Sequence, residues 1–287
     1  MPIAVIAFDF DPLFRLGTDV SVRWQTLALA TAVLVCLAGA AVLGRRRGLR
    51  ADDLLYIAIG AAPGAVVGGR IGYALLVPEA FAAGPLSLFD PSIGGLELGL
   101  AVVGGLGTAA VVATLLGTPV GQWAHVATIP LLAAIAGGKL TMALGGSGQG
   151  RPFDGDWATA YLGAGPWVIA APAMPSHPSQ VYEAIGTVLI ALLVLVASSL
   201  GLFRAGDGRR LLVALAGWCA VRAVVSLTWR DPAVIGGLPA GGVIAIVIGV
   251  TAAVGAIAWS VWWPRRERAR AAAAQPHWPD PETRPPF

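Results

Sequence analysis

The chain has 287 residues, of which 56% are hydrophobic and only 12% are charged, and its mean hydropathy is +0.75. A typical soluble domain carries about 25% charged residues and is far less apolar. The composition therefore excludes an ordinary soluble protein and indicates an integral membrane protein. The formal net charge is only +3. Because the basic residues lie in short blocks between apolar runs, the pattern indicates membrane topology rather than nucleic-acid binding.

Apolar runs long enough to cross a bilayer, which takes about 20 residues, occur seven times. The predicted spans are residues 24–44, 53–77, 98–117, 121–144, 179–203, 209–229 and 240–263. The predicted fold class is all-α, a polytopic membrane protein with seven transmembrane helices. Residues 1–20 contain Asp9, Asp11 and Asp19 instead of a basic start and an apolar core, so we do not expect a cleaved signal peptide there.

The arginines predict the orientation of these spans, because cytoplasmic loops carry an excess of basic residues. They follow the first, fifth and seventh spans: Arg45, Arg46, Arg47, Arg50, Arg204, Arg209, Arg210, Arg265, Arg266, Arg268 and Arg270. The alternate segments carry acidic residues, so we place the N-terminus outside and the C-terminus in the cytoplasm. Residues 1–264 are expected to form one transmembrane domain. The Ala- and Pro-rich residues 265–287 are expected to form a disordered cytoplasmic tail.

Neither a metal site nor a soluble cofactor is expected. The two cysteines, Cys36 and Cys219, both fall inside apolar runs, a pattern that fits neither a disulfide framework nor a zinc site. We interpret both as small packing residues.

Few ionisable residues lie inside the predicted spans, where a charge is costly and usually functional. Arg70, Lys139, Arg222 and Glu183 come from different spans and fall at similar depths in the outer leaflet, given a rise of about 1.5 Å per helical residue. Three cations beside one anion would repel each other, so the pattern predicts that an anion such as a lipid phosphate joins them. Alternatively, the arginines extend to the membrane surface, or the position of Lys139 reflects chance.

The string His177-Pro178-Ser179-Gln180-Val181-Tyr182-Glu183 opens the fifth predicted span. Proline is tolerated in the first turn of a helix, and the string could serve only to begin that helix. A helix N-terminus also attracts anions, and His177, Gln180 and Glu183 are spaced to fall close to one face. The string therefore also predicts a polar site in the outer leaflet.

This string, together with Gly68-Gly69-Arg70-Ile71-Gly72-Tyr73, resembles the bacterial prolipoprotein diacylglyceryl transferases, over about residues 8–264. The resemblance implies an enzyme of the bacterial plasma membrane. It would transfer the diacylglyceryl group of phosphatidylglycerol to the lipobox cysteine thiol of a prolipoprotein, making a thioether and releasing glycerol phosphate. The implied partners are phosphatidylglycerol, other membrane lipid and the prolipoprotein signal peptide, and we expect a monomer.

The predicted site combines this resemblance with the charges inside the spans. The departing phosphate needs cations, and the thiol needs a group that takes its proton. Arg222 matches the family's sixth-span arginine, and Lys139 aligns with another arginine of the family. The predicted catalytic residues are His177, Glu183, Arg222 and Lys139. The predicted phospholipid-binding residues are Arg70, Lys139, Arg222, Gln180 and Tyr182.

The sequence also departs from the family pattern. Between Gly138 and Gly150, the asparagines and the glutamate of the family's signature block are absent. Lys139 replaces an arginine there, although lysine cannot bind phosphate through two parallel hydrogen bonds. Gln25 stands where the family has tyrosine, and Ser226 stands where it has glutamate.

The histidine that the family carries before the Gly-Gly pair of its third span is missing from residues 99–105. If that histidine takes the thiol proton, His177 or Glu183 must replace it, or no turnover occurs. The alternative function is therefore a catalytically inactive family member that binds phospholipid or lipoprotein signal peptides. A transporter is a third alternative, but the inner halves of the spans hold almost no ionisable residue that could line a path for charged cargo.

Overall fold

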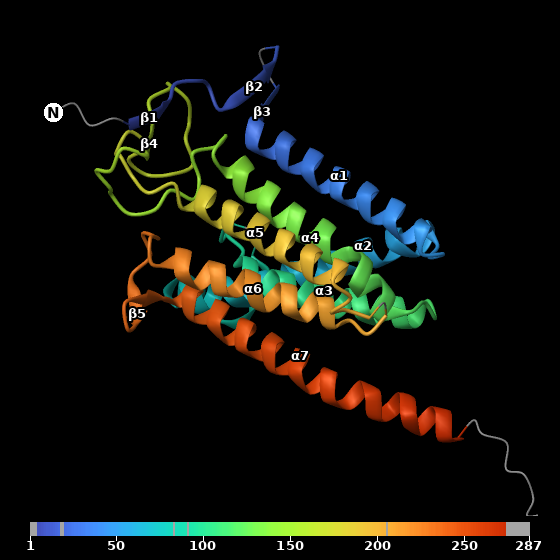
Figure 1. The fold of residues 1–287 in the computed structure, drawn as a ribbon. Helices are drawn as coiled ribbons and strands as arrows, with labels where there is room; N and C mark the ends of the chain where they lie inside the picture. Colours follow the sequence, from blue (N-terminus) through green and yellow to red (C-terminus); the bar gives the residue numbers. More distant parts are fainter. Residues whose placement is uncertain (1–4, 18–19, 83, 91, 205, 274–287) are drawn as a thin grey trace, which may run out of the picture.

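The computed structural model describes residues 5–17, 20–82, 84–90, 92–204 and 206–273. Within these ranges, long helices of alternating direction pack side by side into one bundle (Figure 1). They are α1 (Trp24–Arg46), α2 (Ala51–Leu76), α3 (Leu98–Leu115), α4 (Val120–Met142), α5 (Ser179–Ser199), α6 (Arg209–Ser226) and α7 (Ala240–Ala273). Each begins within two residues of the start predicted from the sequence.

The last helix is longer than predicted. Helix α7 continues to Ala273, past the predicted end of the transmembrane domain at residue 264, so the first part of the predicted disordered tail is helical. Arginine and alanine dominate this extension, and both are strong helix formers. The rest of the predicted tail, residues 274–287, lies outside the described residues.

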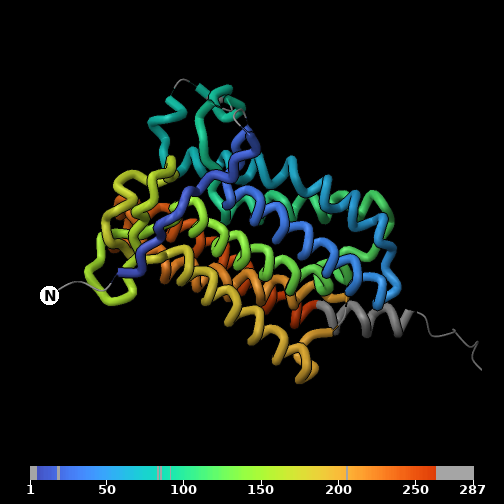
Figure 2. Tube along the Cα trace, turned by 90° about the horizontal axis from the view of Figure 1, so that it is seen from above, coloured from blue at the N-terminus to red at the C-terminus, as the bar shows by residue number. Residues whose placement is uncertain are grey.

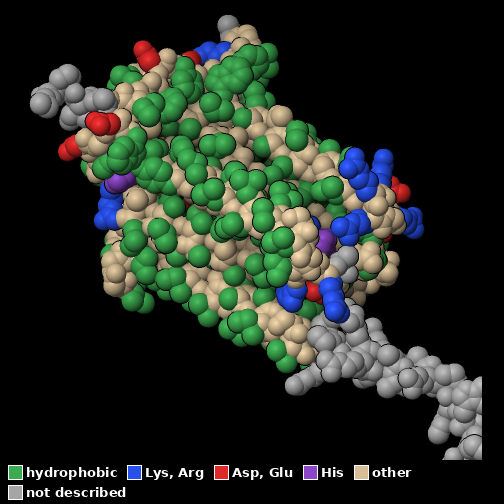
Figure 3. Space-filling model, in the orientation of Figure 1, with side chains coloured by type: hydrophobic (Ala, Val, Ile, Leu, Met, Phe, Trp, Pro, Cys, Tyr) green, Lys and Arg blue, Asp and Glu red, His purple; other side chains and the backbone are tan. Residues whose placement is uncertain are grey.

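Among the described helices, six are long and apolar enough to cross a membrane, namely α1 to α5 and α7. Helix α6 has three arginines in its 18 residues, Arg209, Arg210 and Arg222, which lowers its apolar character. Figure 3 shows a largely apolar surface over the middle of the bundle, with Lys and Arg side chains gathered at the end where α1 leads into α2. The protein is a helical, multi-pass membrane protein.

Short strands gather at one end of the bundle, which we call the strand end (Figure 1). They are β1 (Val5–Phe8), β2 (Leu13–Leu16), β3 (Val20–Arg23), β4 (Ala158–Tyr161), β5 (Ala233–Ile235) and β6 (Leu238–Pro239). Strand β1 pairs with β4 in parallel, whereas β2 with β3 and β5 with β6 are antiparallel. The all-α prediction missed these strands, because two to four residues are too few to show the alternation of a strand. We call the opposite end of the bundle the arginine end.

Glycines bring α2 and α3 together over much of their length. A Cβ atom on Gly64 or Gly68 of α2 would overlap the backbone of α3 at Gly104 or Leu100, respectively. Without hydrophobic driving force in lipid, helices associate through such close backbone contacts. The close approach of α2 and α3 therefore depends on glycine at these positions.

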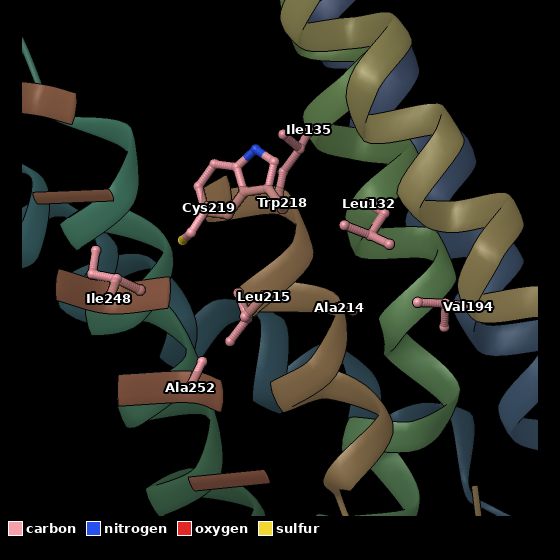
Figure 4. Packing of buried hydrophobic residues seen from close by; sticks show 9 residues of the cluster. All are labelled: Leu132, Ile135, Val194, Ala214, Leu215, Trp218, Cys219, Ile248 and Ala252. Carbon is pink, nitrogen blue, oxygen red and sulfur yellow. The ribbon is translucent and has the colours of Figure 1, made fainter. Parts of the chain in front are cut away.

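One face of helix α6 packs into the interior of the bundle. Figure 4 shows its side chains Ala214, Leu215, Trp218 and Cys219 between residues of the neighbouring helices. The other members of this cluster are Leu132 and Ile135 of α4, Val194 of α5, and Ile248 and Ala252 of α7. Trp218 and Cys219 are both fully buried, so Cys219 is a packing residue as predicted. Protein rather than lipid therefore covers this face of α6, and a charge on it can be paired inside the bundle.

The segment between α2 and α3 projects to one side of the strand end (Figure 2). It contains the short 3-10 helices η1 (Pro78–Phe81) and η2 (Pro85–Phe89). The longer connection between α4 and α5 lies at the same end and contributes β4. Both connections are irregular, and together they surround the ends of the helices that carry the site.

Candidate functional site

Oppositely charged side chains from α3, α4, α5 and α6 meet near the strand end. Lys139 Nζ lies 2.8 Å from Glu183 Oε2. Arg222 donates from Nη1 to Glu183 Oε1 at 2.9 Å and from Nη2 to Glu97 Oε1 at 2.9 Å. We call Glu97, Lys139, Glu183 and Arg222 the charge cluster. They meet because α3 and α5 begin at this end of the bundle and α4 and α6 end there.

Glu97 is the member of the cluster that the sequence analysis missed. It is the N-cap of α3, where its side chain accepts hydrogen bonds from the backbone N–H groups of Gly99 at 2.8 Å and Leu100 at 2.7 Å. It is 3% exposed. The absence of a side chain at Gly72 of α2 makes room for Glu97, since a Cβ atom on Gly72 would lie 2.6 Å from Glu97 Cβ. Acidic side chains are favoured near a helix N-terminus, so the place of Glu97 directly before an apolar run was a signal for its position, although not for its contact with Arg222.

Arg222 is held on several sides. It is 5% exposed, and its guanidinium carbon lies 4.7 Å from the ring centroid of Trp229 and 5.9 Å from that of Trp218. Both Nη atoms donate to carboxylates, whereas Nε has no hydrogen-bond partner among the described residues. Packing against two indole rings fixes the plane of the guanidinium.

The formal charges of the cluster cancel. Two carboxylates pair with two cations, an arrangement that permits burial where an unpaired charge would cost several kcal/mol. The prediction that three cations surround a single anion is therefore wrong. It failed because Glu97 was overlooked and because Arg70 lies elsewhere, so an added phosphate is not needed to balance the charge.

A cavity of about 730 Å³ opens beside the charge cluster, and all members of the cluster line it. Part of its wall is apolar, formed by Leu29, Leu76, Val77, Leu96, Leu98, Ala134, Ile135 and Met142. Another part is polar, formed by Gln25, Gln149, Gln180, Arg230 and Asp231. A cavity with both kinds of wall suits an amphipathic molecule.

Two glutamines in the cavity wall offer hydrogen-bond acceptors. Gln149 donates from Nε2 to the carbonyl of Thr159 at 2.8 Å, and Gln180 donates to the hydroxyl of Tyr161 at 3.3 Å. The Oε1 atoms of both glutamines have no partner among the described residues. Burial raises the pKa of Tyr161 in β4 to about 12, although the hydrogen bond from Gln180 opposes the change. The phenol of Tyr161 therefore keeps its proton at neutral pH.

The connection between α4 and α5 is tied to the cavity by Arg230. Its Nε donates to the carbonyl of Gly150 at 2.7 Å, its Nη1 to the carbonyl of Ala170 at 2.8 Å and its Nη2 to Ser176 Oγ at 3.0 Å. Gly150 is needed here, because a Cβ atom on it would overlap the carbonyl of Thr228. These contacts fix the connection as one wall of the cavity.

Comparison with known proteins places this chain in a family. The family model described as prolipoprotein diacylglyceryl transferase matches residues 12–259. The chain belongs to the prolipoprotein diacylglyceryl transferase family. Proteins named phosphatidylglycerol–prolipoprotein diacylglyceryl transferase are among its relatives. The one from Methylocella silvestris is 29% identical over 70% of this chain and 75% of the relative. The one from Trichormus variabilis is 26% identical over 90% of this chain and 93% of the relative. The one from Gluconacetobacter diazotrophicus is 27% identical over 93% and 95%.

Arg70 does not join the charge cluster, contrary to the prediction. Its Nε donates to the carbonyl of Leu88 at 2.9 Å, and its Nη2 donates to the carbonyl of Asp90 at 2.8 Å. Nη1 also donates to the carbonyl of Ile93, and the guanidinium carbon lies 5.2 Å from the ring centroid of Phe81. Arg70 thus holds the segment between α2 and α3, whose carbonyls occupy the donors that a phosphate would need.

His177 and Tyr182 lie outside the cavity lining, so the predicted grouping of His177 with Gln180 and Glu183 is corrected. His177 stacks on Phe153 with 4.0 Å between ring centroids, and its Nδ1 lies 3.3 Å from Tyr182 Oη. The start of α5 turns only Gln180 and Glu183 toward the cavity. Burial, and secondly the charge of Arg151, lowers the pKa of His177. His177 is therefore neutral at pH 7.

The departures from the family pattern have structural counterparts. Ser226 is 1% exposed, and a Cβ atom on Gly242 of α7 would lie 3.0 Å from its Cβ. This tight contact favours a small side chain at this position, and the second acid beside Arg222 is Glu97 at the start of α3. Gln25 lines the cavity and accepts a hydrogen bond from Ser147 Oγ at 3.1 Å.

No metal-binding group was found in the described ranges, where three or more His, Cys, Asp or Glu side chains nowhere come together in a suitable way.

Proposed function

We propose that this protein is a phosphatidylglycerol–prolipoprotein diacylglyceryl transferase, an enzyme that acts in lipoprotein biosynthesis. It moves the diacylglyceryl group of phosphatidylglycerol to the thiol of a lipobox cysteine. The observation that carries this proposal is the meeting of Lys139 and Arg222 with two carboxylates in a membrane-embedded cavity. Membership of the family supports it independently.

The proposal includes a location and a topology. The enzyme lies in the bacterial plasma membrane as a monomer. It has seven spans, which are the six apolar helices and α6. The arginine end faces the cytoplasm, since basic residues are retained on that side, and the strand end lies outside together with the N-terminus. Residues 1–264 form the transmembrane domain. The cavity then opens in the outer leaflet, where a lipobox cysteine close to a signal helix can reach it.

The cavity suits phosphatidylglycerol at three points. Its apolar wall accommodates the start of the acyl chains, and its two cations attract the phosphate. The Oε1 atoms of Gln149 and Gln180 have no partner among the described residues, and a small rotation of these lining side chains lets them accept hydrogen bonds from the hydroxyl groups of the terminal glycerol. Two neutral hydrogen-bond acceptors on the protein favour a headgroup that carries hydroxyl groups over a choline headgroup, which has no hydrogen-bond donor.

Phosphate binding requires the charge cluster to rearrange. Lys139 and Arg222 both hold Glu183 in the free protein, and the phosphate oxygens compete with that carboxylate for the same donors. Arg222 remains fixed by Glu97 and by the ring of Trp229. A charge-assisted exchange of one anion for another leaves both cations paired. Glu183, which is fully buried, loses its cationic partners in this exchange, and this favours its uptake of a proton.

The reaction then balances as a displacement at carbon. The thiol loses its proton, the sulfur forms a bond to the glycerol carbon that carries the phosphate, and the carbon–oxygen bond breaks. The electron pair of that bond leaves with glycerol phosphate, whose charge Lys139 and Arg222 stabilise. Glu183 takes the thiol proton, because the incoming phosphate removes its cationic partners and adds a negative charge beside it. His177 is not among the residues that line the cavity.

A reconstituted assay tests the proposal. The purified protein is placed in phosphatidylglycerol vesicles with a lipobox peptide, and the mass of the peptide is measured. We expect the peptide to gain the diacylglyceryl mass, and Lys139→Ala to reduce the rate by about 10²- to 10³-fold, as removal of one charge-stabilising donor does elsewhere.

The matched control is Arg15→Ala, which removes an exposed cation at the same end of the bundle and should leave the rate unchanged. An unmodified peptide, in vesicles where a related enzyme succeeds, would overturn the enzyme proposal. The protein would then be the inactive family member that binds phospholipid or signal peptides.

A further inference from the structure

A second pocket lies at the arginine end, far along the bundle from the charge cluster. It has a volume of about 230 Å³ and is lined by Arg47, Gln122, His125, Val126 and Gly206. These residues come from the connection between α1 and α2, the start of α4 and the connection between α5 and α6. The proposed transfer reaction uses none of these residues.

Buried polar atoms beside this pocket lack partners. His125 is 5% exposed and lines the pocket, and its Nδ1 has no hydrogen-bond partner in the described part of the chain. Arg210 is 8% exposed and donates from Nη1 to the carbonyl of His125 at 3.3 Å, while its Nε is likewise unpartnered there. Native proteins rarely leave buried polar groups unsatisfied. These groups therefore indicate a site for a polar ligand.

The surroundings of the pocket favour an anion. Arg47 and Arg210 carry permanent positive charges. Helix α4 begins two residues before Gln122, its N-cap Pro119 makes no side-chain cap hydrogen bond, and its first turn has no acidic residue. The positive end of the helix dipole is thus left without an acidic partner from this helix.

The carboxylate of Asp207, whose charge acts on His125, does not reverse this balance. Asp207 accepts a hydrogen bond from the backbone N–H of Arg209 at 2.9 Å, and its Oδ2 lies 3.8 Å from Arg209 Nε. Its charge is therefore matched by a neighbouring arginine, and Arg47 and Arg210 remain in excess around the pocket.

We propose that this pocket binds a phosphate group, supplied either by an anionic lipid headgroup at the membrane surface or by free phosphate. Guanidinium groups bind phosphate oxygens through paired hydrogen bonds, and His125 adds a further polar contact. The site is separate from the substrate cavity, so it can be tested without reference to diacylglyceryl transfer.

The test measures binding with two probes. Inorganic phosphate is added to the purified full-length protein in detergent, against potassium chloride of equal ionic strength, and the unfolding temperature is recorded. In the second arm, native mass spectrometry counts phosphatidic acid molecules bound in mixed vesicles with phosphatidylcholine. The arm that responds identifies the source of the phosphate.

The variants change exposed side chains, so that loss of folding does not confuse the result. Arg47→Gln and Gln122→Glu alter the pocket, and Arg50→Gln removes a neighbouring exposed arginine that does not line it. We expect the ligand-dependent rise in unfolding temperature, or the bound lipid, to fall at least about threefold in both pocket variants and to persist in Arg50→Gln. The proposal fails if the wild-type protein responds in neither arm, or if all proteins respond alike.

Discussion

Replacing Glu97 by glutamine is the sharpest test of the charge cluster. The carboxylate accepts hydrogen bonds from Arg222 and from the backbone N–H groups of Gly99 and Leu100. Glutamine keeps the size of the side chain but removes the charge, and its amide NH₂ cannot accept a hydrogen bond. Arg222 then keeps Glu183 as its only carboxylate partner among the described residues. Glu183 also pairs with Lys139, so one negative charge is left to balance two positive charges.

The magnitude follows from these contacts. Breaking a buried ion pair from one side costs about 3–5 kcal/mol, and loss of a good N-cap accounts for about 1 kcal/mol within that total. At about 2 °C per kcal/mol for a chain of this size, Glu97→Gln should lower the unfolding temperature by roughly 6–10 °C. Circular dichroism in detergent measures this change. Diacylglyceryl transfer should fall as well, because Arg222 loses the contact that positions it.

The matched control is Glu79→Gln, which neutralises an exposed acid in η1 and should change stability by less than about 0.5 kcal/mol. In a double-mutant cycle with Arg222→Gln, the loss caused by Glu97→Gln should shrink by at least about 1.5 kcal/mol. Equal losses in the two glutamate variants, or additive losses in the cycle, would refute the reasoning.

Three further predictions address other parts of the molecule. Lys139→Arg should keep the transfer activity of the wild-type protein within about threefold, since a guanidinium binds phosphate at least as well; a loss as large as that of Lys139→Ala, in the peptide mass assay, would contradict the phosphate role. Gly104→Ala should destabilise the protein by about 1–3 kcal/mol because its Cβ overlaps the backbone of α2, whereas Gly107→Ala, whose Cβ has open space, should be neutral or stabilising in the same thermal unfolding measurement. His177 should titrate below about 6.5 in ¹³C-histidine NMR. Because its pKa is lowered on folding, its contribution to stability is present above the unfolded pKa and is lost as pH falls through the folded value. Arg151→Gln should move the folded pKa upward, and an unchanged value would show that burial acts alone.

The sequence by itself determined the helices. Every predicted span begins within two residues of an observed helix, because apolar runs in a membrane protein form helices whose backbone hydrogen bonds are internal. Lys139, Glu183 and Arg222 were also correctly grouped, since helix rise and alternating direction place them at one depth without any knowledge of packing. The short strands were missed, because they depend on pairing between distant segments such as β1 and β4.

Only the tertiary structure decided which side chains share the cavity. Depth along a helix is set by residue number, but the direction in which a side chain points depends on how each helix is rotated against its neighbours. Arg70 has the right depth, yet it faces the connection between α2 and α3 and binds its carbonyls. His177 has the right spacing, yet it stacks on Phe153 outside the cavity. Glu97 reaches Arg222 because Gly72 in α2 leaves room for it, a contact between helices that no local pattern specifies.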